Sequence, residues 1–183
     1  MNSSPTHRLL AIDDNPAIHE DFRKIFEKPS RTGGVVEALA STLFGSPGVP
    51  AQRVSFELDS ACQGQEGFEL VKAALAAGRP YSLAFVDVRM PPGWDGIETI
   101  EQLWKVDPDL QIVICTAYSD YSLDDMRARL GDSDSLVVLK KPFDTVEMLQ
   151  ITHALTRKWE LTREARFRME DLDRLVSERT REL

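Results

Sequence analysis

Four short apolar runs constrain the fold more than any other feature of the sequence. They are rich in β-branched or large apolar residues, and none alternates apolar with polar positions: Leu9–Ile12, Ser82–Val88, Gln111–Ala117 and Ser135–Lys140. A continuous apolar run of this length is typical of a strand buried on both faces, as in a parallel sheet covered by helices. A fifth run, Arg53–Ala61, alternates and is typical of an edge strand.

Helical patterns lie between these runs. Apolar residues recur at helical spacing in 17–26, 65–77 and 97–106, a short charged segment covers 123–130, and a helical pattern begins at Thr145. Strands that alternate with helices indicate βαβ units. We therefore expect an α/β fold: a flavodoxin-like, doubly wound parallel sheet of five βα units in the order 2-1-3-4-5.

One internal segment is additional to the five predicted βα units. Residues 29–52 are bracketed by Pro, Gly and Ser and follow the first predicted helix. Within them, residues 35–44 carry apolar residues at helical spacing, which predicts an inserted loop with one short amphipathic helix. A disordered insertion is the alternative.

The C-terminal segment predicts a long helix over 145–183. Residues 151–183 contain no Pro or Gly and are rich in Glu, Arg and Leu. A heptad-like stripe runs through Ile151, Leu155, Ala165, Met169, Leu172, Val176 and Leu183. We interpret the part from about residue 158 as a parallel two-helix coiled coil that makes the chain a homodimer. A solvated or self-docked single helix is the alternative.

Composition excludes several classes of protein. The formal charge is −8, with 30 acidic and 22 basic residues, which argues against direct nucleic acid binding. No apolar run approaches the ~18–20 residues that a membrane span requires. The N-terminus has no basic leader, so we expect a cytoplasmic protein. The two cysteines indicate neither a disulfide framework nor a zinc site.

Polar residues collect where the predicted strands end. Asp13 and Asp14 end the first strand, Asp87 the third, Thr116 the fourth and Lys141 the fifth. Parallel strands bring these ends to one edge of the sheet, where clustered carboxylates repel one another and favour a hard cation such as Mg²⁺. A carboxylate can attack phosphorus, and Mg²⁺ with a lysine would neutralise the incoming phosphoryl oxygens.

These residues, in this order, resemble the signature of response regulator receiver (CheY-like) domains over about residues 7–157. The matching positions are Asp13–Asp14, Asp87 with Met90-Pro91 and Gly96, Thr116, and Lys141-Pro142-Phe143. The resemblance implies that Asp87 is the phosphoacceptor and that Mg²⁺ is held by Asp13, Asp14, Asp87 and the backbone carbonyl of Arg89. It also implies that Thr116 is the switch hydroxyl, that Lys141 contacts the phosphoryl group, and that the Lys141–Pro142 bond is cis.

The sequence departs from the family pattern in three places. The loop after Asp87 is one residue longer than usual and contains Pro92, Gly93 and Trp94. Arg89 and Tyr118 stand where residues usually tune dephosphorylation, and Val138 replaces a common aromatic switch residue. The usual coupling between Thr116 and that aromatic is therefore expected to differ here.

The resemblance implies a phosphorylation-dependent module of a two-component system rather than an enzyme, with only family-typical self-phosphorylation and dephosphorylation. Its partner would be a histidine kinase or phosphotransfer protein, and its C-terminal helix would relay the change to an output domain outside this chain. A phosphorylation-independent dimerisation or scaffold module is the alternative. An aspartate-nucleophile phosphatase is disfavoured because Arg89 stands where that class needs a second acid.

Overall fold

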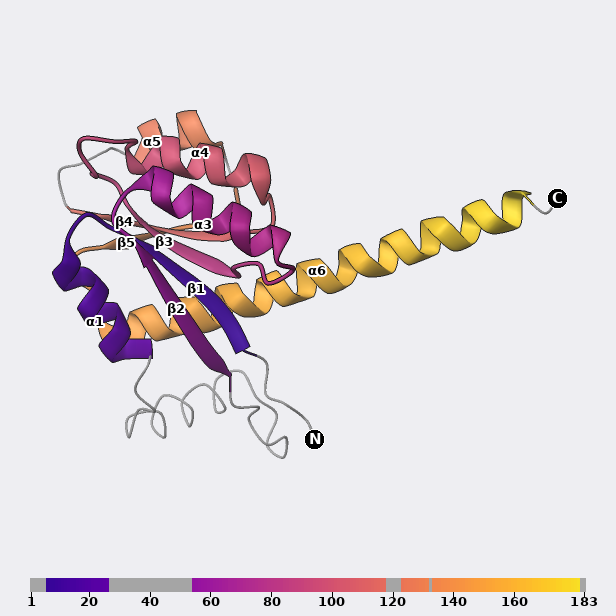
Figure 1. Cartoon of the computed structure of the whole chain (residues 1–183), viewed down its shortest axis with the longest axis horizontal. Coiled ribbons are helices and arrows are strands. Elements are labelled where there is room, and N and C mark those ends of the chain that lie inside the picture. The colour runs from indigo at the N-terminus through magenta and orange to yellow at the C-terminus, as the bar shows by residue number, and fades with distance from the viewer. Residues whose placement is uncertain (1–5, 27–53, 118–122, 132, 182–183) are drawn as a thin grey trace.

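Five parallel strands form the centre of the computed structural model, in the order β2-β1-β3-β4-β5 (Figure 1). The structure describes residues 6–26, 54–117, 123–131 and 133–181. The predicted strand order is confirmed. The strands are β1 (Thr6–Ile12), β2 (Ser55–Ala61), β3 (Leu83–Asp87), β4 (Gln111–Thr116) and β5 (Leu136–Lys140).

Burial explains why the runs that form the central strands are continuously apolar, whereas the run that forms β2 alternates. Every residue of β3 and β4 is buried, whereas β2 is mostly half-buried and lies at the edge of the sheet. Central strands covered by helices on both sides need apolar side chains on both faces, and an edge strand does not. The continuous runs and the alternating run thus correspond to the interior and the edge of one sheet.

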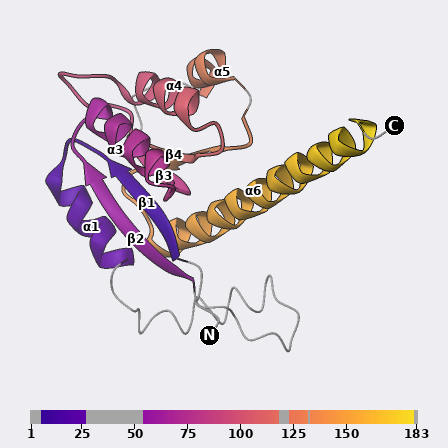
Figure 2. The same cartoon turned by 45° about the vertical axis from the view of Figure 1, so that its right-hand side comes forward.

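Helices cover both faces of the sheet (Figures 1 and 2). One face carries α3 (Gly64–Ala76), α4 (Gly96–Val106) and α5 (Leu123–Leu130), over a core that includes Leu10, Val86 and Ile112. The other carries α1 (Pro16–Phe26) and α6 (Thr145–Arg181), over a core that includes Leu9, Phe85 and Val113. The predicted short helix in 35–44 lies outside the described residues.

The last helix, α6, continues far beyond the sheet (Figure 1). Its 37 residues correspond to a rod of about 55 Å. The Asp144 carboxylate accepts hydrogen bonds from the backbone of Val146 and Glu147 at its start, at 2.9 and 3.0 Å. Met148 and Leu155 pack into the core, so the first half of the predicted apolar stripe is buried against the sheet.

The second half of α6 is exposed. Met169 and Leu172 are 66% and 60% exposed, and Ala165 is also exposed. None of the described helices combines the length and apolar character that crossing a membrane requires.

Strand register brings the predicted site residues together. Ile12 of β1 pairs with Val86 of β3, and Asp87 pairs with Cys115 of β4. Asp13, Asp87 and Thr116 therefore leave three neighbouring strands at the same edge. Lys141 joins them because its backbone amide donates to the Thr116 carbonyl at 2.9 Å.

Candidate functional site

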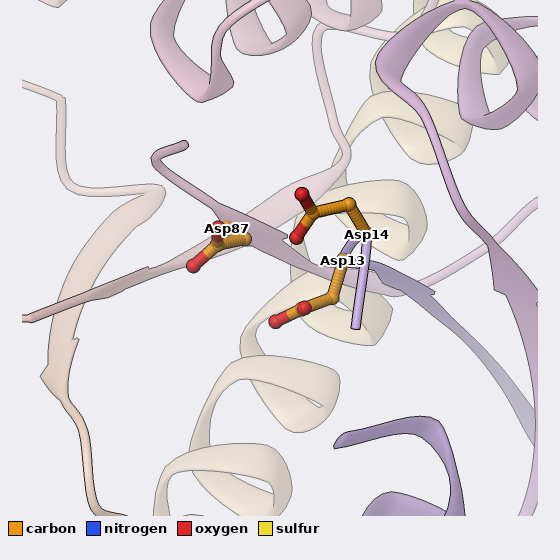
Figure 3. A group of neighbouring side chains, drawn as sticks. All are labelled: Asp13, Asp14 and Asp87. Carbon is orange, nitrogen blue, oxygen red and sulfur yellow. The ribbon is translucent and has the colours of Figure 1, made fainter. Parts of the chain in front are cut away.

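Three carboxylates meet at the C-terminal edge of the sheet (Figure 3). One oxygen atom from each of Asp13, Asp14 and Asp87 lies within 4.8 Å of the others. Asp13 and Asp87 are 3% and 8% exposed, whereas Asp14 is exposed to solvent. The cluster thus has two buried members and one open side.

The loop that carries Asp13 is held on three sides. Its backbone amide donates to the Ala61 carbonyl of β2 at 3.1 Å, and its carboxylate accepts from the Asn15 amide at 2.9 Å. His19 of α1 is buried, and its Nε2 donates to the Asp13 carbonyl at 2.7 Å. His19 was not predicted as part of the site, because nothing in the local sequence shows that a histidine one turn into a helix faces the preceding loop.

Lys141 bridges two of the carboxylates. Its Nζ donates to Asp13 Oδ2 at 2.7 Å and to Asp87 Oδ1 at 2.6 Å. The Lys141–Pro142 peptide bond is cis, as the resemblance implied. The lysine thus neutralises part of the negative charge that the strands bring together.

The electrostatics of the site reflect burial and this shared cation. Burial raises the pKa of Asp87, although the hydrogen bond and charge of Lys141 oppose the rise. Burial alone would lower the pKa of Lys141, but the Asp13 and Asp87 carboxylates together raise it. Lys141 therefore stays protonated, while the ionised form of Asp87 is disfavoured relative to water.

Thr116 and Arg89 flank Asp87. Thr116 is buried, and its hydroxyl donates to the Ala117 carbonyl at 2.9 Å. The Arg89 backbone amide donates to Asp87 Oδ2 at 3.1 Å. The metal-ligand role of the Arg89 carbonyl stays a prediction, and Tyr118 lies outside the described residues.

The long loop after Asp87 is anchored by contacts that the sequence did not reveal. Its Pro91–Pro92 bond is cis, and Gln63 Nε2 donates to the Pro91 carbonyl at 3.3 Å. Trp94 packs edge-on against Phe68 of α3, with ring centroids 5.8 Å apart. The additional residues therefore fold back onto the β2–α3 side of the site.

The loop ends where α4 begins. The Asp95 carboxylate caps α4 by accepting from the Glu98 amide at 2.7 Å. A Cβ at Gly96 would overlap the backbone carbonyl of Asp87, so only glycine fits this approach.

The donor set fits a hard divalent cation. Three carboxylates on one open-sided cluster offer the oxygen ligands that Mg²⁺ prefers, and the exposed Asp14 leaves room for the waters that Mg²⁺ usually keeps. Asp13, Asp14 and Asp87 are the residues that could hold the ion.

Comparisons with known proteins agree with this geometry. The model of the response regulator receiver domain family matches residues 51–153. Sporulation initiation phosphotransferase F of Bacillus subtilis (strain 168) is 29% identical over 92 residues, which cover 46% of this chain and 70% of that protein.

Solved structures show the same fold. A CheY-like response regulator receiver domain protein from Methanospirillum hungatei JF-1 is 20% identical with a TM-score of 0.60, covering 86% of this chain and 98% of that chain. A response regulator receiver protein from Sinorhizobium medicae WSM419 is 17% identical with a TM-score of 0.58, covering 86% and 99%. With a family match over more than half its length, this chain belongs to the response regulator receiver domain family.

Proposed function

We propose that Asp87 accepts a phosphoryl group from a histidine kinase or phosphotransfer protein, with Mg²⁺ bound by Asp13, Asp14, Asp87 and the Arg89 carbonyl. The observation that carries this proposal is the meeting of three carboxylates within 4.8 Å beside the Lys141 ammonium, which lies 2.6 Å from Asp87 Oδ1. The chain acts as a regulatory module in the cytoplasm rather than as an enzyme on a separate substrate.

In this proposal each residue has a defined task. An Asp87 carboxylate oxygen bonds to phosphorus as the bond from phosphorus to the donor breaks, and the donor leaves with that electron pair. Lys141 neutralises charge on the phosphoryl oxygens, and Mg²⁺ when bound supplies further neutralisation. The Thr116 hydroxyl turns from the Ala117 carbonyl towards the phosphoryl group, a contact that exists only in the modified state.

The output half of the proposal concerns α6. Its exposed stripe of Ala165, Met169 and Leu172 pairs with the same stripe of a second copy, and the dimeric helix relays the change to an output domain outside this chain. Exposed apolar residues repeating at steps of three and four are the pattern that a coiled-coil partner buries.

Intact-mass measurement with Mg²⁺ and acetyl phosphate tests the acceptor role. The wild-type chain should gain the mass of one phosphoryl group, and Asp87→Asn should gain none. Asp144→Asn is the matched control, since it lies at the same edge and asparagine can still cap α6. Equal incorporation in wild type and Asp87→Asn would leave the scaffold alternative as the better account.

Sedimentation velocity tests the dimer. Leu172→Glu should shift the chain to a monomer, because it places a charge within the apolar stripe. Phe167→Glu is the matched control: Phe167 is also 66% exposed, but it lies on another side of the helix. A wild-type chain that sediments as a monomer at all concentrations would remove the dimeric relay from the proposal.

A further inference from the structure

The corner between α4 and β4 is joined to both elements by side-chain hydrogen bonds. It consists of Asp107, Pro108 and Asp109, and Asp107 Oδ1 accepts from the Asp109 amide at 3.2 Å. Trp104 Nε1 of α4 donates to the Leu110 carbonyl at 3.0 Å, and Gln111 Nε2 of β4 donates to the Asp109 carbonyl at 2.8 Å. The corner therefore moves with α4 and β4.

Helix α6 is bound to this corner by an ion pair. The Arg166 guanidinium lies 2.7 Å from Asp109 Oδ1, and the Asp109 side chain is only 10% exposed. Beside the pair lies a cavity of about 320 Å³, lined by the corner, by Leu75 and Val106, and by Arg163, Arg166, Phe167 and Glu170 of α6. The four α6 residues share one side of the helix.

A second buried acid lines the same cavity. Asp107 is 4% exposed, and its Oδ2 has no hydrogen-bond partner among the described residues. Burial raises the pKa of Asp107, and Arg163 is near enough for its charge to oppose that rise. The corner thus presents two buried carboxylates to two arginines of α6.

This contact leaves the apolar stripe of α6 free. Successive residues are about 100° apart around a helix, so Ala165, Met169 and Leu172 lie roughly 140° away from the side that lines the cavity. One side of α6 can hold the receiver domain while the other holds a second copy.

Helix α4 connects the corner with Asp87. Its first residue, Gly96, lies against the Asp87 backbone and donates to the Val88 carbonyl at 2.8 Å. Ile97, Ile100 and Leu103 are fully buried along its length, so its 11 residues are packed as one body. Helix α4 is therefore a packed connection, about 16 Å long, between the Asp87 loop and the corner.

We propose that the Asp107–Asp109 corner and the arginine-bearing side of α6 form a latch that fixes the direction in which α6 leaves the domain, and that α4 couples this latch to the Asp87 loop. The holding role stands on the ion pair and cavity alone. The coupling rests on the proposed function of Asp87.

Distances between two spin labels on the full chain test the holding role. The labels are placed at Lys72→Cys on α3 and Arg174→Cys on α6, with the exposed Cys62 changed to Ser and the buried Cys115 retained. Labelled chains are diluted with unlabelled protein so that only distances within one chain are measured. We expect one narrow distance peak, its loss in Asp109→Asn and in Arg166→Gln, and its return in the charge-exchanged pair D109R/R166D.

The matched control is Asp134→Asn. Asp134 also pairs with α6, through Lys158 at 2.9 Å, but its side chain is 89% exposed, so the narrow peak should persist. Should the charge-exchanged pair fail to fold, Arg166→Gln decides alone, since Arg166 is 52% exposed and its loss leaves the core intact. A narrow peak in both Asp109→Asn and Arg166→Gln would overturn the latch.

Beryllofluoride, a mimic of the phosphoryl group, tests the coupling. In the same labelled chain, Mg²⁺ with BeF₃⁻ should shift the distance peak, whereas in Asp109→Asn it should leave the already broadened distance distribution unchanged. Fluorine NMR of the same samples reports whether BeF₃⁻ is bound. Bound BeF₃⁻ without a shift overturns the coupling alone, whereas no binding in wild type overturns the proposed function of Asp87 and the coupling with it.

Discussion

The sheet carries two groups of acidic residues that differ in how their charges are paired with basic residues. Along the edge strand β2 and just before β4 and β5, four acids each have their own basic partner at 2.6 to 2.9 Å: Asp59 with Arg8, Glu57 with Arg79, Asp109 with Arg166, and Asp134 with Lys158. Where the strands end, Asp13 and Asp87 share the single Lys141 ammonium, with Asp14 close by.

The difference separates a structural end from a binding end. Charges that are paired one to one need no further partner, and these pairs join α6 and the edge strand to their neighbours. Carboxylates that outnumber their basic partners repel one another and destabilise the native state unless a cation binds between them. The end with the poorer charge balance is therefore the one suited to binding.

Among the changes that test this difference, Lys141→Met should alter the free energy of unfolding most. It leaves two buried carboxylates without their ammonium, so the free energy of unfolding in EDTA should fall by about 3 kcal/mol. Urea denaturation measures it, with Lys140→Met as the control. A fall no larger than that of the control would show that the carboxylates do not depend on the lysine.

Mg²⁺ should raise stability by a slightly smaller amount. At about one hundred times its Kd, an ion that binds only the native state raises the free energy of unfolding by about 2.7 kcal/mol. Calorimetry with and without EDTA should show this in wild type and a reduced gain in Asp14→Asn. An equal gain in both would place the ion elsewhere.

Asp59→Asn, in the edge strand β2, should have the smallest effect on the free energy of unfolding. Burial alone would raise the pKa of Asp59, but hydrogen bonds from Tyr81 and Arg8 and the nearby arginine charges lower it below the ordinary 3.8. Because the folded-state pKa is lowered, this stabilisation is present above pH 3.8 and is lost as the pH falls through the folded-state value.

At pH 7 the substitution should cost at most about 1 kcal/mol, since the pair is partly solvated. Urea denaturation at pH 7 and at pH 3 should show a difference from wild type that shrinks at the lower pH. Glu69→Gln, which removes an exposed pair with Lys72, is the control and should be near neutral at both. A constant Asp59→Asn difference would mean that the Asp59 charge is not its source.

The strands, and the meeting of the predicted site residues at one edge of the sheet, were predictable because both follow from the pattern of apolar runs. Residues 83–86 and 112–115, the interiors of two of the runs, are buried and apolar throughout, and a parallel sheet brings the polar residues that follow them to one edge. The family model begins only at residue 51, so Asp13 and Asp14 are joined to Asp87 by strand pairing rather than by that match.

The long-range contacts were not predictable. Arg166 is one of several arginines on a charged helix, and nothing near it in the sequence shows that it meets Asp109. His19 reaches the Asp13 carbonyl, and Trp94 reaches Phe68, only after the helices pack. Such contacts depend on the tertiary arrangement and produce no periodic pattern in the sequence from which they could be predicted.

Because α6 continues without a break beyond Arg166, a small tilt at that residue moves the end of the helix by a much larger distance. The 15 residues from Arg166 to the end of the helix at Arg181 form an arm of about 22 Å. A tilt of about 10° around Arg166 would therefore swing the tip by about 4 Å. In the proposed dimer, a small rotation at the start of this arm would thus become a movement at its tip large enough to change the packing between the two helices.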